Sequence, residues 1–257
     1  MSLRSCHNRY ARASDWTADD EGERDILDLK EMAAREAVKY VRDGMVVGLG
    51  SGSTASIAIK LMGELVREGW QLVGIPTSRT SEVLGRSVGF KIGDLRDYPD
   101  VDVTIDGADE VDPKLNLVKG LGGALVREKI VAASTKNEVI VIDQSKLVDF
   151  ICQKSPLPVE ILQFGQEATI RKLEEFGCKA TMRKSNGDVF ISDNGNFIAD
   201  CKFTKISNPA KMEWELNLVP GVVDNGLFVG LAHVVIVASK DGTKTLTKSK
   251  GPTLRVP

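Results

Sequence analysis

The segment MVVGLGSGSTASIAIKLMGELV, residues 45–66, decides the fold class. A short apolar run, Met45 to Leu49, leads through glycines and small hydroxyl residues into a pattern with helical spacing. The apolar residues of that pattern are Ile57, Ala58, Leu61, Met62 and Leu65. A strand, a tight turn and an amphipathic helix form the repeating unit of a parallel sheet wrapped by helices. The segment therefore predicts an α/β fold.

The same alternation continues on both sides of this segment. A helical pattern begins near Leu29, and the chain then runs through further expected strands at 71–75, 101–105 and 138–142, with helices at 80–88 and 123–133. The apolar run His233 to Ala238 looks like a buried strand that returns to this sheet. Residues 26–154, with 227–257, are thus expected to form one domain around a parallel sheet.

Residues 155–226 have a different rhythm. Strands are expected at 159–162, 179–183 and 189–192 and through Cys201, with helices at 166–176 and 209–218 and a turn at 193–196. This order predicts a small α+β domain with an antiparallel sheet.

Composition excludes several classes of protein. The 257 residues are 42% hydrophobic and 27% charged with a net charge of -2, which favours neither nucleic acid nor a membrane as partner. The four cysteines form no C-x-x-C pair, so a reducing cytoplasm is the simplest location. Only two histidines are present, which points acid–base chemistry to other residues. Residues 1–25 are expected to be a disordered tail, and their early arginines leave organellar targeting as the alternative.

The first candidate site is the glycine-rich stretch Gly48 to Ala55. Converging backbone amides, hydroxyl donors and a helix N-terminus together suit a phosphate dianion. A plain strand-to-helix turn is the alternative. A Walker loop would end in Gly-Lys-Ser/Thr, and a dinucleotide fingerprint would need glycine at Ser53, so a phosphate without a nucleotide is favoured.

The second candidate is Asp106-Gly107-Ala108-Asp109, directly after an expected strand. Because ligands bind at the carboxyl ends of parallel strands, both acids should border the same crevice as the glycine loop. Nearby carboxylates can divide acid and base roles. A capped turn or a pair of divalent-metal ligands remains open, while the neighbouring Glu110 and Asp112 are interpreted as solvated turn charges.

The third candidate combines Lys119 and a second glycine-rich turn, Gly120 to Gly123, with Glu128 about two turns into the following helix. A lysine beside a crevice can stabilise an oxyanion, and a carboxylate on a rigid helix can act as a base. Taken alone, Arg127-Glu128-Lys129 is typical of an exposed helical face. A fourth motif, Asp143 to Lys146, brings Lys146 to another strand end, where it could close over a phosphate.

Six segments in this order resemble the ribose-5-phosphate isomerase type A family: GLGSGSTA, VTIDGADEVD, LVKGLGGALVREKIVA, IDQSKLV, PLPVEIL and SDNGNFIADCKF. The likeness spans about Leu29 to Leu246. It implies interconversion of D-ribose 5-phosphate and D-ribulose 5-phosphate in the non-oxidative pentose phosphate pathway, without cofactor or metal. It also implies a Rossmann-like domain carrying a smaller α+β, ferredoxin-like domain, in a homodimer or homotetramer.

The resemblance also assigns site residues. Glu128 matches the proton-transferring base, and Asp106, Asp109 and Lys119 match the groups that handle ring opening and the enediolate. The expected substrate contacts are Ser51, Gly52, Ser53, Thr54, Gly107, Ala108, Gly120, Leu121, Gly122, Lys146 and Lys30. Two departures stand out: Leu121 replaces a glycine found in part of the family, and the first 25 residues have no counterpart in its short pattern.

The chemistry can also be derived without the family. Moving a carbonyl from C1 to C2 requires taking a proton from C2 and returning one to C1, which a single base can do through a cis-enediolate.

Two other classes of protein compete with an isomerase. The first is a sugar-phosphate sensor domain, for which the chain lacks room for a helix-turn-helix before its first helix. The second is a coenzyme A transferase, which would use a glutamate as nucleophile.

Overall fold

The computed structural model describes residues 18–247, with side chains from residue 26 onward. Residues 1–17 of the expected tail lie outside this range. The first helix, α1 (Ala18–Val38), begins well before Leu29, so the expectation of a disordered tail was wrong for residues 18–25. Helices extend cooperatively from packed turns into polar residues that show no apolar period, which is why the pattern placed this start too late.

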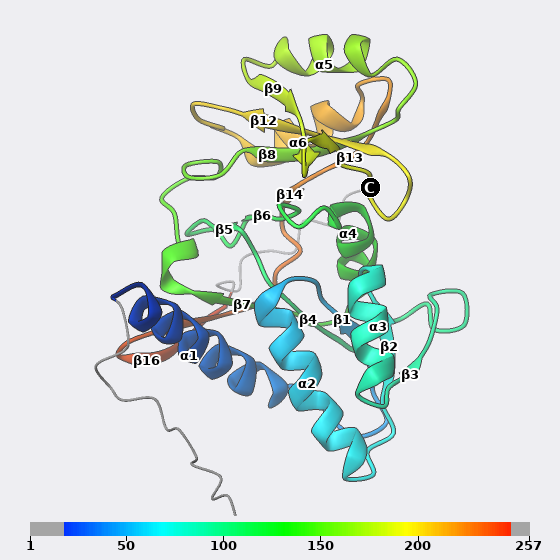
Figure 1. The fold of residues 1–257 in the computed structure, drawn as a ribbon, viewed down its shortest axis with the longest axis vertical. Helices are drawn as coiled ribbons and strands as arrows, with labels where there is room; N and C mark the ends of the chain where they lie inside the picture. Colours follow the sequence, from blue (N-terminus) through cyan, green and yellow to red (C-terminus); the bar gives the residue numbers. More distant parts are fainter. Residues whose placement is uncertain (1–17, 248–257) are drawn as a thin grey trace, which may run out of the picture.

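The large lobe is built on a seven-stranded sheet (Figure 1). Its strands are β1 (Val46–Leu49), β2 (Val73–Pro76), β3 (Lys91–Ile92), β4 (Val103–Asp106), β7 (Glu138–Asp143), β15 (Val234–Ser239) and β16 (Gly242–Thr247). The order is β16-β15-β7-β4-β1-β2-β3, and every pairing is parallel except that of β16 with β15. The predicted parallel sheet, including the return of the last apolar run, is confirmed.

Each face of this sheet is covered by different elements. Helices α1, α2 (Ser53–Arg67) and α3 (Arg79–Ser87) lie on one face, where α1 and α2 pack on apolar side chains of β1, β4, β7 and β15 (Figure 1). The other face carries helix α4 (Leu125–Ala133) and a three-stranded sheet of β5 (Glu110–Val111), β6 (Leu117–Val118) and β14 (Leu227–Phe228). The strands of this small sheet have two residues each, too few to show a periodicity.

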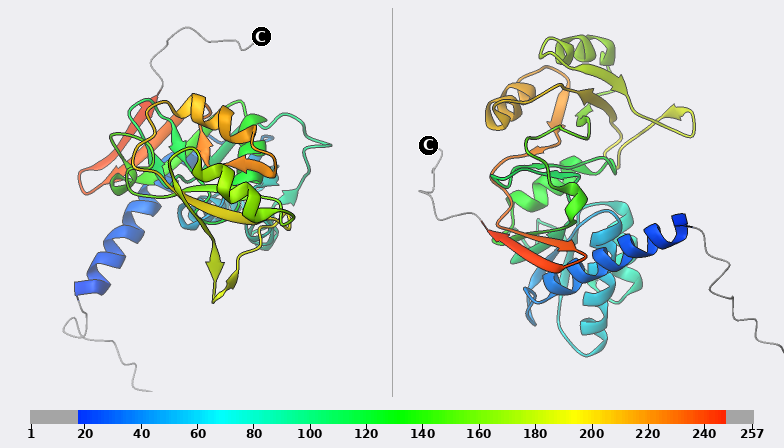
Figure 2. Two further views of the ribbon diagram at one scale, coloured as in Figure 1. Left: turned by 90° about the horizontal axis from the view of Figure 1, so that it is seen from above. Right: turned by 90° about the vertical axis from the view of Figure 1, so that its left-hand side faces the viewer.

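The small lobe stacks on the large one along the long axis of the molecule (Figures 1 and 2). Its strands are β8 (Leu157–Ile161), β9 (Lys179–Met182), β12 (Phe197–Lys202) and β13 (Val222–Asn225), with helices α5 (Gln166–Glu174) and α6 (Pro209–Asn217). The order β13-β8-β12-β9 is antiparallel throughout and has the ferredoxin-like connectivity. The fold class is therefore as expected, whereas the exact limits of two domains stay a prediction.

One expected strand of the small lobe was largely wrong. Residues 189–192 form no strand of the four-stranded sheet: β11 (Asp188–Val189) pairs with β10 (Lys184–Ser185) in a two-stranded hairpin, and Ile191 makes an isolated bridge to Phe197 of β12. Val189 and Ile191 are exposed, so their β-branched character does not reflect burial in a core. Across the described range, no helix is both long and apolar enough to span a membrane.

Candidate active site

The pocket lies where the order of the parallel sheet reverses, between β1 and β4. At such a switch point the two strand ends leave a crevice for a ligand. The chain after β1 stays close to β4: the Gly50 N–H donates to the Ile105 carbonyl at 3.1 Å. A Cβ on Gly50 would lie only 2.4 Å from that carbonyl oxygen, so the approach requires glycine.

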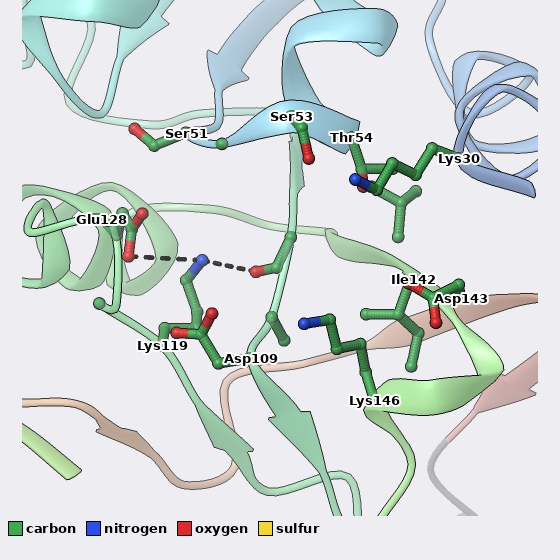
Figure 3. A pocket seen from close by; sticks show the side chains of 16 residues that line it. Lys30, Ser51, Ser53, Thr54, Asp109, Lys119, Glu128, Ile142, Asp143 and Lys146 are labelled. Carbon is green, nitrogen blue, oxygen red and sulfur yellow. Dashed lines mark hydrogen bonds and ion pairs between the residues drawn. The ribbon is translucent and has the colours of Figure 1, made fainter. Parts of the chain in front are cut away.

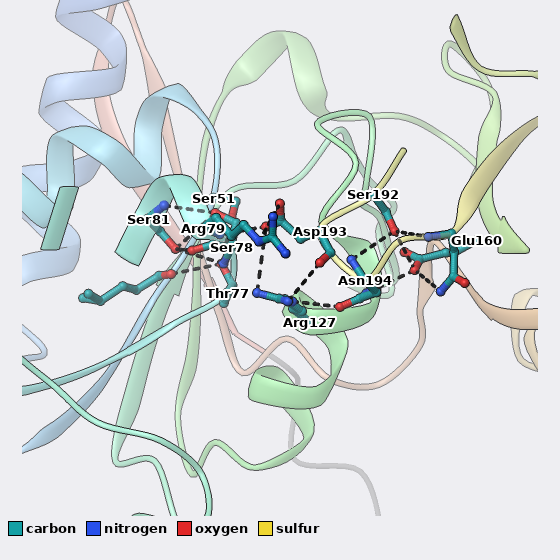
Figure 4. A network of polar contacts seen from close by, with 12 residues as sticks. Ser51, Thr77, Ser78, Arg79, Ser81, Arg127, Glu160, Ser192, Asp193 and Asn194 are labelled. Atoms are coloured by element: carbon teal, nitrogen blue, oxygen red, sulfur yellow. Dashed lines mark hydrogen bonds and ion pairs between the residues drawn. The ribbon is translucent and has the colours of Figure 1, made fainter. Parts of the chain in front are cut away.

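The first glycine loop places the N-terminus of helix α2 at this crevice. Helix α2 is preceded by Gly52, which has φ 91° and supplies no side chain to cap the first turn. Unsatisfied N–H groups and the helix dipole favour an anion at such an end. The Ser51 hydroxyl is bonded to the hydroxyls of Thr77 and Ser78, each 2.8 Å away (Figure 4). These bonds tie the first glycine loop to the residues that follow β2.

The loops near residues 50, 106 and 119 converge on one cavity of about 210 Å³ (Figure 3). Its walls are formed by Lys30, Ser51, Gly52, Ser53, Thr54, Gly107, Ala108, Asp109, Lys119, Gly120, Gly122, Glu128, Val141, Ile142, Asp143 and Lys146. All the residues expected from the sequence line it except Asp106 and Leu121. Every wall residue belongs to the large lobe.

Lys119 lies between two buried carboxyl groups. Its Nζ is 3.0 Å from Asp106 Oδ2 and 3.5 Å from Glu128 Oε2, and it donates to the Gly107 carbonyl at 2.6 Å (Figure 3). Asp106 Oδ1 accepts from the backbone N–H groups of Ser51 and Gly107. Asp106 is 1% exposed and is not among the residues that line the cavity, and its described contacts are with Lys119 and the two backbone N–H groups.

Burial changes the protonation of this cluster. Desolvation raises the pKa of Glu128 to about 7, with Asp106 and Asp109 adding to the effect and Lys119 opposing it. Burial alone would lower the pKa of Lys119, but Asp106 and Glu128 raise it above its ordinary value. Lys119 therefore stays a cation, while Glu128 can take up and release a proton near neutral pH.

Asp109 connects the second glycine loop to the pocket. Its Oδ2 accepts from the Leu121 N–H at 3.0 Å. Burial raises the pKa of Asp109, opposed by that N–H and by Lys119, Lys146 and Arg183. The Leu121 side chain is 40% exposed and is not among the residues that line the cavity, and its backbone N–H holds Asp109; a contact of Leu121 with substrate stays a prediction. Leu121 is not among the residues with positive φ, which explains why leucine is tolerated there.

Two turn acids were misread. Glu110 and Asp112, expected to be solvated, are buried. The Glu110 carboxylate accepts from the backbone N–H groups of residues 153–155, and Asp112 accepts from those of Lys114 and Asn116. A carboxylate saturated by backbone donors can be buried, and the distant partners of Glu110 leave no local pattern in the sequence.

Sequence reasoning also missed wall residues and a link between the lobes. Val141 and Ile142 line the cavity at the end of β7, directly before Asp143, the first residue of the fourth candidate motif, which lines it too. The strand-end rule that indicated this motif could have indicated both residues. The link is a polar network in which the small-lobe residue Asp193 accepts from the Arg79 N–H at 2.7 Å, and Arg127 donates to Asn194 at 2.8 Å (Figure 4). No local motif predicts contacts so distant in sequence.

A pocket of this kind can hold a small phosphorylated ligand at the helix end while a buried carboxyl moves a proton at its other end, which defines an α/β enzyme of the sugar-phosphate isomerase class. The family described as ribose 5-phosphate isomerase A (phosphoriboisomerase A) matches residues 73–242. The chain belongs to the ribose 5-phosphate isomerase A family.

Similar proteins span nearly the whole chain. A ribose-5-phosphate isomerase A from Gloeobacter violaceus is 48% identical over 229 residues, which are 89% of this chain and 100% of that protein. One from Pyrococcus abyssi is 44% identical and covers 87% of this chain and 99% of its own. The structure of a D-ribose-5-phosphate isomerase in complex with phospho-erythronic acid has a TM-score of 0.84 at 44% identity, covering 86% of this chain and 99% of that one.

Proposed function

We propose that this chain interconverts D-ribose 5-phosphate and D-ribulose 5-phosphate by moving one proton between C2 and C1 through a cis-enediolate. The observation that carries the proposal is the Glu128 carboxyl, which lies buried beside Lys119 in the same cavity as the first glycine loop. Family membership supports the substrate.

The substrate phosphate binds at the N-terminus of α2, on the backbone of Ser51 to Thr54. Lys30 and Lys146 line the cavity and add positive charge (Figure 3). Holding the phosphate at this end keeps the sugar carbons in register with Glu128, so that binding energy remote from the reaction raises turnover.

The reacting end faces the buried cluster. Asp109 moves the proton that opens the furanose ring, Glu128 takes the proton from C2 and returns it to C1, and the Lys119 ammonium stabilises the enediolate oxygens. A general base contributes about 10²–10⁴-fold, and a preorganised donor to the oxyanion supplies roughly 3–4 kcal/mol more. Asp106 acts through Lys119, which it keeps charged and in place.

The test is an assay of ribose 5-phosphate conversion in excess EDTA, with wild type and Glu128→Gln side by side. Wild type should turn over, and the variant should lose ~10²–10⁴-fold in kcat while still binding substrate. Activity that disappears with EDTA would reject the metal-free mechanism. A variant with full activity would remove Glu128 from its role, and binding without turnover in wild type would favour the sensor alternative.

We propose further that the enzyme works in the cytoplasm as a homodimer or homotetramer. The three cysteines of the described range, Cys152, Cys178 and Cys201, are free thiols, which supports a reducing compartment. Sedimentation equilibrium of the purified chain measures the assembly, and a single protomer across micromolar concentrations would reject it.

Fractionation of cells with an antibody tests the location, and recovery in an organelle would reject the cytoplasmic assignment.

A further inference from the structure

The small lobe forms no wall of the described pocket, yet one of its side chains contacts the second glycine loop. Arg183, at the end of β9, donates from Nη1 to the carbonyl oxygens of Gly120 at 2.8 Å and Leu121 at 2.9 Å. Its Nε donates to Asp200 Oδ2 at 3.0 Å, and its Nη2 bonds the other oxygen of that carboxylate. Because the guanidinium is bonded to the carboxylate on one side and to the two carbonyls on the other, its orientation is fixed.

The peptide that Arg183 holds also contacts Asp109. The Gly120 carbonyl and the Leu121 N–H belong to one planar unit, so they turn together. The carbonyl faces Arg183 and the N–H donates to Asp109 Oδ2 at 3.0 Å. This peptide turns about ψ of Gly120 and φ of Leu121, and Gly120, with φ 101°, has no Cβ to restrict its backbone, so contacts from the small lobe help to fix the orientation of the peptide.

Phe190 reinforces the same contact. Its ring lies against Gly123, where an added Cβ would come within 2.4 Å of the ring, and the Arg183 guanidinium lies 5.9 Å from its centroid. The Gly123 N–H donates to the Gly120 carbonyl at 2.9 Å, which closes the turn beneath the ring. The small lobe thus contacts this turn at Gly120, Leu121 and Gly123.

We propose that Arg183 is a positioning residue that orients the Asp109 carboxylate through the Gly120–Leu121 peptide, an inference that rests on the proposed isomerase function. The small lobe then serves the reaction without touching substrate. Losing this hold lets the peptide turn, and Asp109 loses its backbone donor.

A double-mutant cycle with Asp109→Asn tests this route. Arg183→Met should lower kcat by about 10- to 100-fold with little change in KM, because small displacements of a reacting group cost rates of this size. Arg183→Lys should lie between, since an ammonium cannot bond both oxygens of Asp200 with a planar fork while it bonds the two carbonyls. On the Asp109→Asn background, Arg183→Met should cost less than about 2-fold more, because the two residues act in series.

Lys129→Met is the matched control. Lys129 also joins the lobes, through Asp224 at 2.7 Å and Glu213 at 3.2 Å, but does not contact the loop. It should weaken the lobe junction without lowering kcat. Equal losses from Arg183→Met on both backgrounds, or full activity of Arg183→Met or of Asp109→Asn, would overturn the inference.

A second measurement does not depend on turnover. Hydrogen exchange of the Leu121 amide should be faster in Arg183→Met and unchanged in Lys129→Met, and unaltered exchange in both would also overturn the inference. Loss of wild-type isomerase activity, by contrast, would reject the proposed function while the exchange result still decides whether Arg183 holds the peptide.

Discussion

Asp106 and Glu128 are two buried carboxyl groups that share one cation, and they differ in what else surrounds them. Asp106 lies 3.0 Å from Lys119 and accepts two backbone N–H bonds. Glu128 lies 3.5 Å from the same ammonium, and its Oε2 has no hydrogen-bond partner in the described part of the chain. Neighbouring acids thus obtain different roles from their surroundings: Asp106 fixes the position of Lys119, and Glu128 exchanges a proton.

Removing the shared cation should have the largest effect on this pair. In Lys119→Met, turnover should fall about 10²–10³-fold, because the enediolate loses a preorganised donor. The acid limb of kcat/KM should also move to higher pH, since Lys119 lowers the pKa of Glu128. Kinetics across pH measure both effects. A variant with wild-type turnover would show that Lys119 serves the fold alone.

The pH profile of the wild type should show the titration of Glu128. Glu128 must be deprotonated to act as a base, and its pKa is raised to about 7 by burial. We expect kcat/KM to be full above this pH and to fall about tenfold for each unit below it. An acid limb near the ordinary value of a glutamate, about 4.3, would contradict the assignment.

Asp106→Asn should have a smaller effect on the rate but a clear effect on the profile. Asp106 raises the pKa of Glu128, so its neutralisation should move the acid limb to lower pH. The new amide places a donor where the carboxylate met Lys119, so the free energy of unfolding should drop by about 1–3 kcal/mol. Urea unfolding and the pH profile are the measurements, and a limb that moves upward would contradict the prediction.

The smallest effect is expected at a third buried acid, Glu138, which interacts electrostatically with Asp106 and Glu128. Neither of its carboxyl oxygens has a hydrogen-bond partner in the described structure. Desolvation, followed by Asp106, raises its pKa well above the usual value. The folded state therefore binds a proton that the unfolded state releases, so stability falls as pH rises above about 4.3.

Glu138→Gln removes that proton linkage. The variant should be more stable than wild type by about 1–3 kcal/mol at pH 8 and about equal at pH 4. Urea unfolding at the two pH values measures the difference. A variant that is less stable at pH 8 would show that the charged form of Glu138 is favourable in the fold.

The sequence predicted the central strands and the first loop because both depend on local features. Apolar runs such as Val46 to Leu49 are buried wherever they pair, and the glycines after them turn the chain into α2. The edge strand β16 was missed because its side chains are mostly exposed and show no apolar pattern. The ligand-facing residues were predictable to the extent that they follow strand ends.

The burial of Glu128 could not be predicted from Arg127-Glu128-Lys129, which is typical of a solvated helical face. The structure explains the triplet: Arg127 bonds Asn194, Lys129 pairs with Asp224, and Glu128 faces the pocket between them. The two cations serve contacts with the small lobe, whose partners lie 67 and 95 residues away. Only the packing of the lobes distinguishes this helix from an exposed one.

Because every wall of the described pocket comes from residues 30–146, the site proposed to bind the sugar is encoded in one continuous part of the gene. An engineer who wishes to accept a different phosphorylated aldose can recombine that part alone. The small lobe can be exchanged with a relative's as a cassette, provided that the graft keeps the arginine that reaches Gly120 and its Asp200 partner.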